Sequence, residues 1–199
     1  MPPYRAWLVD LDGTLYRASW VRLAMTAELL AGGGRSVRVL RVFRQEHERL
    51  RAELVKPVSS PYEEQLRRAA ERLGRDVSEV RRVVDYWMVC RPGKWLRLFR
   101  RRRLLAEIAG FRQQGGRTAV VSDYPAAQKL AALGAASLFD VVVANGESGG
   151  PNRLKPWPDG YLLAAERLGM AAEECLVVGD RQDADGEAAR RAGMAFRRI

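Results

Sequence analysis

The sequence predicts an α/β protein with a doubly wound parallel sheet into which an all-helical cap domain is inserted. Two observations predict the sheet: short apolar segments recur along the chain, as in strands buried on both faces, and helical stretches lie between them. A third predicts the insertion, because a long segment after the first strand shows helical periodicity alone.

Each of the four predicted strands ends directly before a polar residue or a glycine. The strands are residues 6–9 before Asp10, 118–121 before Ser122, 139–144 before Asn145, and 176–178 before Gly179-Asp180. Helices closed by glycine are expected at residues 104–114 and 158–168. Because open α/β sheets bind ligands at the carboxyl ends of their strands, we expect a ligand site at this edge.

The inserted cap domain is predicted to span residues 16–94, with hinges near 15–18 and 91–94. Residues 1–15 and 95–199 then make up the core. The expected cap helices are residues 19–30, 36–54, 60–73 and 78–90. Ser19, Ser60 and Ser78 are the expected N-caps, and Ser60 opens a capping box that has proline at the first helical position.

The positive charge of the chain is concentrated in this middle part. The 199 residues carry a formal net charge of +10, with 30 arginines and only four lysines. Residues 16–104 hold 22 Lys/Arg and 10 Asp/Glu, whereas the rest of the chain holds 12 and 14. An arginine bias can come from genomic base composition, so it is weak evidence for a nucleic-acid ligand.

Composition argues against several classes of protein. No apolar run approaches the roughly 20 residues of a membrane span, and residues 6–9 are too short for a signal-peptide core, so a cytoplasmic location is expected. Cys90 and Cys175 lack metal-ligand spacing and are expected to be small buried apolar residues. His47 is the only histidine, so acid–base chemistry is expected from carboxylates.

Two aspartates follow the first strand, in the stretch Asp10-Leu11-Asp12-Gly13-Thr14. Asp10 can attack phosphorus as a carboxylate nucleophile, and Asp12 can act as general acid toward the leaving oxygen and then as base for water. Gly13 permits a tight turn, and Thr14 can hold the loop with a hydrogen bond. The alternative is a surface turn, since Asp-Gly is a common turn dipeptide.

The same stretch predicts magnesium, because two carboxylates that face a phosphate repel it unless a cation lies between them. Mg²⁺ prefers oxygen ligands. A second acidic cluster, residues 180–185, follows the last strand and supplies a further ligand. Asp180 is the best candidate, Asp185 can position it or a metal-bound water, and Asp183 is a weaker alternative.

Two residues are expected to bind the phosphoryl group. Ser122 follows a buried strand, where its hydroxyl can bind a phosphate oxygen, although an ordinary helix cap is the alternative. Lys155 lies in Leu154-Lys155-Pro156-Trp157-Pro158, a loop stiffened by two prolines. Because lysine is nearly absent from this arginine-rich chain, a lysine on a rigid loop indicates a selected role.

These four motifs, in this order and each at a strand end, resemble the haloacid dehalogenase superfamily, specifically its phosphatase branch with a helical cap. The motifs are DLDGT at 10–14, VVSD at 120–123, LKPWP at 154–158 and VVGDRQDAD at 177–185. The resemblance covers nearly the whole chain. It implies a Rossmann-like core and a cap that excludes water and selects the substrate.

The resemblance also implies the reaction: a magnesium-dependent phosphohydrolase that acts on a small phosphorylated metabolite through an aspartyl-phosphate. Asp10 is then the nucleophile and Asp12 the acid/base, while Ser122 and Lys155 hold the phosphoryl group. The implied magnesium ligands are the Asp10 side chain, the Asp12 backbone carbonyl and the Asp180 side chain, with Asp185 at the second acidic position.

Asp123 departs from the family pattern, in which asparagine commonly follows the motif serine. Together with Thr14, it completes the candidate phosphate-binding set. An extra carboxylate beside an anionic substrate alters its recognition, or else the side chain points away.

Other members of the superfamily provide alternatives. A phosphosugar mutase shares these catalytic residues and stays open. Dehalogenases lack the second aspartate of the first motif, so Asp12 argues against that branch. A phosphonatase needs a Schiff-base lysine in the cap, and neither Lys56 nor Lys94 lies in a recognisable motif of that kind.

The alternative from a different class is a nucleic-acid or anionic-partner binding protein. The four arginines at 100–103 and the basic cap motivate it, although a solvated helix face explains the run more simply. A basic cap can also draw multiply charged phosphates toward the site. Trp20, Arg22 and Trp87 are candidate contacts, with helix packing as the simpler role of both tryptophans.

Overall fold

The structure is a computed structural model that describes residues 4–32, 34–53 and 57–199. Five parallel strands form the central sheet of these described residues. The strands are β1 (Ala6–Asp10), β2 (Arg117–Ser122), β3 (Val141–Ala144), β4 (Cys175–Gly179) and β5 (Ala195–Arg198). Their order is β3-β2-β1-β4-β5, so β1 is central and the direction of sheet growth reverses between β1 and β4. The predicted parallel sheet is confirmed; only β5 is absent from the prediction.

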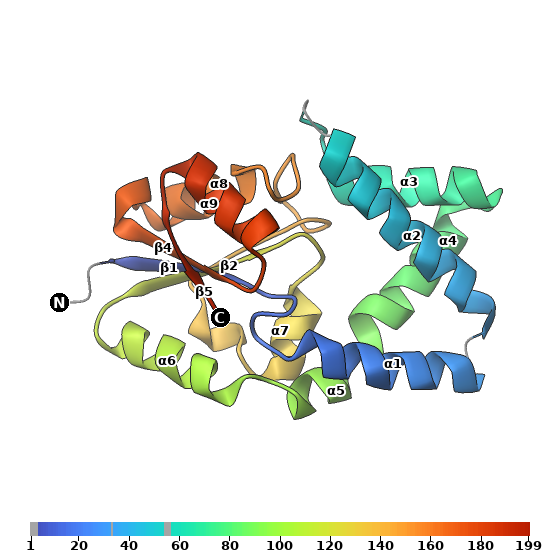
Figure 1. The fold of residues 1–199 in the computed structure, drawn as a ribbon, viewed down its shortest axis with the longest axis horizontal. Coiled ribbons are helices and arrows are strands. Elements are labelled where there is room, and N and C mark those ends of the chain that lie inside the picture. Colours follow the sequence, from blue (N-terminus) through green and yellow to red (C-terminus); the bar gives the residue numbers. More distant parts are fainter. Residues whose placement is uncertain (1–3, 33, 54–56) are drawn as a thin grey trace.

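Helices cover both faces of the sheet (Figure 1). On one face lie α6 (Arg102–Gln113) and α7 (Ala127–Leu133), and on the other α8 (Asp159–Leu168) and α9 (Glu187–Ala192). Successive strand side chains point to opposite faces, so Val9 packs into the apolar cluster of α6 and α7, while Leu8 packs into that of α8 and α9. The sheet is doubly wound, as the sequence predicts.

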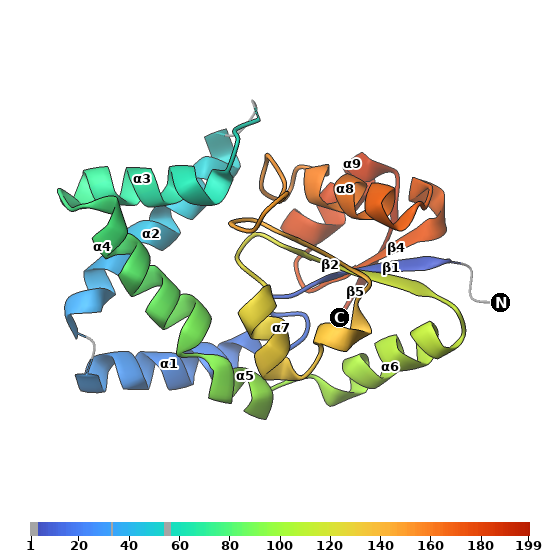
Figure 2. The ribbon, with the colours of Figure 1, turned by 180° about the vertical axis from the view of Figure 1, so that it is seen from behind.

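The helices between β1 and α5 (Gly93–Leu98) lie together on one side of the sheet (Figures 1 and 2). They are α1 (Ala18–Gly32), α2 (Gly34–Glu53), α3 (Pro61–Leu73), α4 (Val77–Val84) and the π-helical segment η1 (Asp85–Cys90). Phe43, Tyr62 and Leu66 are buried in an apolar cluster within these helices. We call them the cap helices; the domain boundaries at 15/16 and 94/95 stay a proposal.

One of the three expected serine N-caps is confirmed. The Ser60 hydroxyl accepts a hydrogen bond from the backbone N–H of Glu63 at 3.3 Å and caps α3. The other two predictions are wrong. Ser19 lies inside α1, and Asp76 caps α4 by accepting from the backbone N–H of Ser78 at 2.7 Å, because Asp76 precedes the first turn. Leu54 and Lys56, which the sequence analysis also considers, lie outside the described residues.

The arginine run at 100–103 is not a single solvated helix face. Helix α6 begins only at Arg102, and Arg102 and Arg103 are exposed. Arg100 is half-buried and donates to the carbonyl of Leu133 at 3.3 Å. Arg101 folds back toward β1 and donates to the carbonyl of Gly13 at 3.4 Å.

Two smaller expectations concern cysteine and the membrane. Cys175 is buried as expected, but Cys90 is exposed, because it ends η1 on the cap surface. No helix in the described ranges combines the length and the hydrophobicity of a membrane span.

Candidate active site

The strand register brings three of the predicted motifs to one edge of the sheet. Asp10 ends β1 and pairs with Val121 of β2, so Ser122 follows one residue further along the neighbouring strand. On the other side of β1, strand β4 ends at Gly179, directly before Asp180. The site therefore lies where the direction of sheet growth reverses, the usual ligand position in open α/β sheets.

The loop after β1 turns at Gly13, whose φ of +103° disfavours any residue with a side chain. A Cβ at this position would lie 2.3 Å from Oδ2 of Asp180, so the glycine also leaves room for that carboxylate. The predicted hydrogen bond from Thr14 is not seen: its hydroxyl is buried and has no partner among the described residues. The backbone holds the loop instead, since the N–H of Thr14 donates to the carbonyl of Leu11 at 3.3 Å.

Three carboxylates gather at this edge. Asp10, Asp180 and Asp185 each place one oxygen within 4.8 Å of the others. Asp183 is not part of the cluster, because its side chain is 67% exposed and forms an ion pair with Arg181 at 2.5 Å. Asp185 is only 2% exposed. Of the two alternatives that the sequence leaves open, Asp185 is therefore the residue in the site.

Lys155 is the cation inside this cluster. Its ammonium lies 2.5 Å from Oδ1 of Asp10 and 2.8 Å from Oδ1 of Asp185, and it also donates to the carbonyl of Val121 at 3.1 Å. Burial alone lowers the pKa of a lysine, but the two carboxylates outweigh burial and raise the pKa of Lys155 well above its ordinary value. Lys155 is therefore a permanent ammonium within reach of Asp10.

When all four groups are ionised, the three carboxylates and the one ammonium carry a net charge of −2. Burial raises the pKa of Asp10 to about 8 against the opposing effect of Lys155, and burial and the charge of Asp185 also raise the pKa of Asp180. Oδ2 of Asp10 and Oδ1 of Asp180 are buried and have no hydrogen-bond partner in the described part of the chain. A hard divalent cation such as Mg²⁺ fits this site, because it would contact the two unpartnered oxygens and neutralise the net negative charge.

Asp12 lies outside this cluster, because its carboxylate is paired with a lysine. Both of its oxygens lie 2.7 Å from the ammonium of Lys129, and the hydroxyl of Tyr16 donates to Oδ1. Burial alone raises the pKa of Asp12, but Lys129 and then Tyr16 outweigh burial and lower this pKa below its ordinary value. The carboxylate of Asp12 is therefore ionised in this structure.

Lys129 is a site residue that the motif analysis misses. It lies on α7, is 4% exposed, and places its ammonium 5.5 Å from the centre of the Tyr124 ring. The sequence contains one signal for it, since Lys129 is one of only four lysines. The argument from lysine scarcity that singles out Lys155 applies to Lys129 equally.

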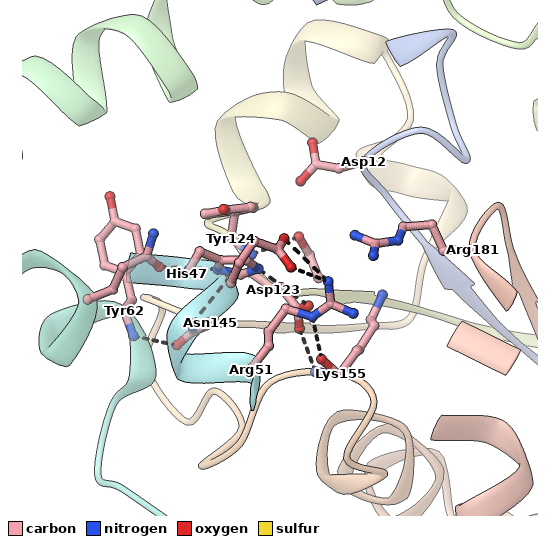
Figure 3. Close-up of polar contacts among 12 residues, drawn as sticks. Asp12, His47, Arg51, Tyr62, Asp123, Tyr124, Asn145, Lys155 and Arg181 are labelled. Atoms are coloured by element: carbon pink, nitrogen blue, oxygen red, sulfur yellow. Dashed lines mark hydrogen bonds and ion pairs between the residues drawn. The ribbon is translucent and has the colours of Figure 1, made fainter. Parts of the chain in front are cut away.

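Ser122 and Asp123 belong to the loop after β2. The Ser122 hydroxyl accepts from the backbone N–H of Tyr124 at 3.2 Å, and Ser122 does not cap α7, which begins at Ala127. The Asp123 side chain contacts the lysine loop and the cap (Figure 3). Its Oδ1 accepts a hydrogen bond from the backbone N–H of Lys155 at 3.2 Å, and its Oδ2 lies 4.0 Å from Nε2 of His47 on the cap. In this structure, Asp123 supports the lysine loop.

The cap helices contact the core beside the same loops (Figure 3). Nε of Arg51, on α2, donates to the carbonyl of Lys155 at 2.8 Å. The His47 ring stacks on Tyr124 with ring centres 4.6 Å apart, and burial lowers the pKa of His47. The backbone N–H of Tyr62 donates to Oδ1 of Asn145 at 3.1 Å. Because these bonds join segments far apart in the chain, the sequence patterns do not predict them.

A cavity of about 1060 Å³ lies between the cap helices and the site. Asp12, Lys129 and Asp180 line its core side, so the cavity opens onto the cluster of charges described above. Of the three suggested cap contacts, Arg22 and Trp87 line the cavity. Trp20 does not line it, because its ring stacks on Phe99 with ring centres 6.0 Å apart.

Similarity to known proteins agrees with this arrangement. The haloacid dehalogenase-like hydrolase family matches residues 4–193. Glyceraldehyde 3-phosphate phosphatase of Methanopyrus kandleri is 30% identical over 203 aligned residues, which cover 98% of this chain and 83% of the relative.

Two solved structures share the fold. YfnB of Bacillus subtilis, a hydrolase solved with bound magnesium, has a TM-score of 0.67 at 15% identity. The superposition covers 97% of this chain and 87% of the YfnB chain. L-2-haloacid dehalogenase of Xanthobacter autotrophicus has a TM-score of 0.65 at 24% identity, with 98% and 77% covered. The family match extends over almost the entire sequence and includes all four motifs. The chain therefore belongs to the haloacid dehalogenase-like hydrolase family.

Proposed function

We propose that this hydrolase is a magnesium-dependent phosphomonoesterase that transfers the phosphoryl group of a small phosphorylated metabolite to Asp10 and then to water. The observation that supports this most strongly is the pair of buried oxygens without partners, Oδ2 of Asp10 and Oδ1 of Asp180, beside the ammonium of Lys155. The curated relative acts, by its name, on glyceraldehyde 3-phosphate, which makes that compound the first substrate to test.

The side chains of Asp10 and Asp180 and the backbone carbonyl of Asp12 would hold Mg²⁺. When bound, the ion supplies charge neutralisation for the phosphoryl oxygens. Asp185 lies in the same carboxylate cluster and would position Lys155 or a metal-bound water, since its oxygens also accept hydrogen bonds from Tyr161 at 2.8 Å and from the backbone of Arg181 at 3.2 Å.

Asp10 is the proposed nucleophile because it ends the central strand and has one free oxygen. One carboxylate oxygen of Asp10 would bind Mg²⁺ and the other would attack phosphorus, and the contact of Lys155 with Oδ1 fixes the orientation of the carboxylate. The Ser122 hydroxyl, one residue further along the neighbouring strand, is the proposed donor to a phosphoryl oxygen. The phosphoryl group then becomes an aspartyl-phosphate on Asp10, and the leaving oxygen needs a proton.

Asp12 is the proposed source and acceptor of protons. Its ionised form, which Lys129 favours, is the form that can take a proton from the attacking water in the second step. The first step needs the protonated form. It therefore requires that an arriving phosphate compete with Asp12 for the ammonium of Lys129.

A phosphate-release screen over phosphomonoesters, including glyceraldehyde 3-phosphate, tests the proposal with and without Mg²⁺. We expect turnover that depends on magnesium and falls at least about 10⁴-fold in Asp10→Asn, because the nucleophile is lost. The matched control is Asp183→Asn, which removes an exposed acid from the motif of Asp180 and should retain turnover.

Acid-quenched protein from the same reactions should carry phosphate on Asp10 in the wild type and none in Asp10→Asn. Turnover that survives in Asp10→Asn would show that the chemistry is assigned to the wrong residue. Release of a phosphosugar isomer without free phosphate would show a mutase instead.

A further inference from the structure

One face of α1 and one face of α2 form the cap side of the cavity. On α2 the lining positions are 37, 40, 41, 44, 45, 48 and 49, which follow the spacing of a single helix face, and the lining positions of α1 follow the same spacing. The proposed phosphate site lies across the cavity, at Asp12 and Asp180. The part of a substrate beyond its phosphate must therefore face these two helices.

Three arginines on these faces, Arg22, Arg41 and Arg44, are exposed and form no ion pair with a carboxylate of the described residues. The other charged side chains of the cap wall have partners of opposite charge. Glu48 pairs with Arg51 at 3.0 Å, while Arg49 and Arg72 both pair with Glu46, at 3.1 and 2.9 Å. The cap wall therefore presents an excess of positive charge to the cavity.

Elsewhere on the cap, arginines are of both kinds. Some pair with glutamates, as Arg67 does with Glu64 at 2.8 Å and Arg91 with Glu28 at 2.6 Å, and others, such as Arg38 and Arg75, form no ion pair within the described ranges. On the cavity face of α1 no acidic residue lines the wall, and on that of α2 the single one, Glu48, is used by Arg51. The arginines that line the cavity therefore have no free carboxylate beside them on these two helix faces.

Two of these arginines lie on α2 at increasing distance along the helix axis from the residue that contacts the lysine loop. Arg51 lies beside Lys155, because its side chain donates a hydrogen bond to the carbonyl of that residue at 2.8 Å. At about 1.5 Å of rise per residue, Arg44 lies about 10 Å and Arg41 about 15 Å further along the helix axis. The cap wall also contains apolar side chains, among them Met25, Leu29 and Trp87. These side chains can contact the carbon skeleton of a substrate.

We propose that Arg41 and Arg44, with Arg22 opposite them on α1, bind a second anionic group of the substrate. The enzyme then prefers phosphate monoesters whose leaving group ends in a carboxylate or a second phosphate over those whose leaving group is neutral. This inference rests on the proposed phosphatase function and specifies its substrate class.

Matched substrate pairs test the inference. Glyceraldehyde 3-phosphate and 3-phosphoglycerate share one carbon skeleton, as do glucose 6-phosphate and 6-phosphogluconate, and within each pair an aldehyde is replaced by a carboxylate. We expect kcat/KM to be at least about tenfold higher for the carboxylate of at least one pair, through a lower KM, because an arginine–carboxylate bond is charge-assisted. Raising the salt concentration should shrink this preference.

The double variant Arg41→Gln/Arg44→Gln should reduce the preference to about twofold or less and leave kcat/KM for the neutral partner unchanged. The matched control is Arg35→Gln/Arg38→Gln: both residues are exposed on the same helix, the charge change is the same, and neither residue lines the cavity. An equal loss of preference in this control would mean that only the overall charge matters and would overturn the inference.

Calorimetry on Asp10→Asn protein, with and without the two arginine substitutions, separates binding from turnover. Equal affinity and equal kcat/KM for both members of each pair would overturn the anion subsite while the phosphatase function stands. Tighter binding of 6-phosphogluconate than of glucose 6-phosphate, lost with Arg41 and Arg44, would support the subsite even if no compound is hydrolysed. Such binding without hydrolysis of any compound would overturn only the proposed phosphatase function.

Discussion

The core and the cap of this protein handle charge in opposite ways. At the sheet edge, Asp10, Asp185, Lys129 and Lys155 are all at most 6% exposed, and each of them has a charged partner from a distant segment of the chain. In the cap, arginines pair with glutamates on the helix surface, and many of these partners are one turn apart. Buried charges require a specific partner at a specific place, whereas exposed pairs can be exchanged at little cost.

The largest expected effect contrasts a buried lysine with an exposed one. Lys155→Met leaves the buried carboxylates without their ammonium, and we expect it to lower the free energy of unfolding by about 3 kcal/mol. Lys94→Met removes an ammonium that is 60% exposed beside Glu28 in the cap, and we expect less than about 1 kcal/mol. Urea denaturation measures both, and equal losses would break the comparison between the two regions.

The second prediction concerns Lys129, the buried partner of Asp12. Without Lys129, burial dominates and the pKa of Asp12 rises, so that the carboxylate ionises at higher pH. Hydrolysis of the aspartyl-phosphate needs ionised Asp12, so the acidic limb of the rate of this second step, measured as dephosphorylation in a single turnover, should move to higher pH in Lys129→Met. We expect the rate to be reduced about 100-fold at pH 6 and less at pH 8. The profile of Lys94→Met should match the wild type, and a profile of Lys129→Met that also matches it would rule out this role.

The third prediction tests whether the carboxylate cluster of the core binds a divalent cation. Mg²⁺ at ten times its Kd should raise the free energy of unfolding of the wild type by about 1.4 kcal/mol. Asp180→Asn should abolish this gain, because it removes an oxygen that has no protein partner, and Asp183→Asn should keep it. Thermal denaturation with magnesium and with a chelator measures the difference, and a gain that persists in Asp180→Asn would contradict the assignment.

The smallest expected effect comes from His47, a buried ionisable group within the cap. Burial lowers its pKa despite the nearby carboxylate of Asp123, so between this lowered pKa and 6.5 the unfolded chain binds more protons at this position than the folded one. The stability that neutral His47 provides is therefore complete above pH 6.5 and is lost as the pH falls through the lowered pKa. Melting temperatures between pH 7 and pH 5 should fall more steeply for the wild type than for His47→Gln; parallel curves would show that His47 is not buried as described.

The sequence predicts the core site well because strand ends determine it. Asp10, Ser122 and Asp180 each follow a short apolar segment, and parallel strands bring such positions to one edge wherever the intervening helices lie. Strand β5 is missed because Ala195–Arg198 contains only two apolar residues, which suffices at the sheet edge but leaves no recognisable apolar segment.

Contacts between distant loops could not be predicted in the same way. The direction of Asp123 depends on the backbone of the Lys155 loop, and the role of Lys129 depends on how α7 packs beside β1. Neither relation leaves a periodic signal in the sequence. Local competition explains another miss, since Asp76 and Ser78 both accept hydrogen bonds well and only the start of the helix decides between them.

The single bond between Arg51 and the carbonyl of Lys155 has a mechanical consequence. Helix α2 runs for 20 residues and bears Arg41 and Arg44 in its middle and Arg51 in its last turns. A rigid tilt of this helix would move all three arginines together. Binding of a ligand at the proposed anion subsite would therefore be coupled through α2 to the backbone of Lys155.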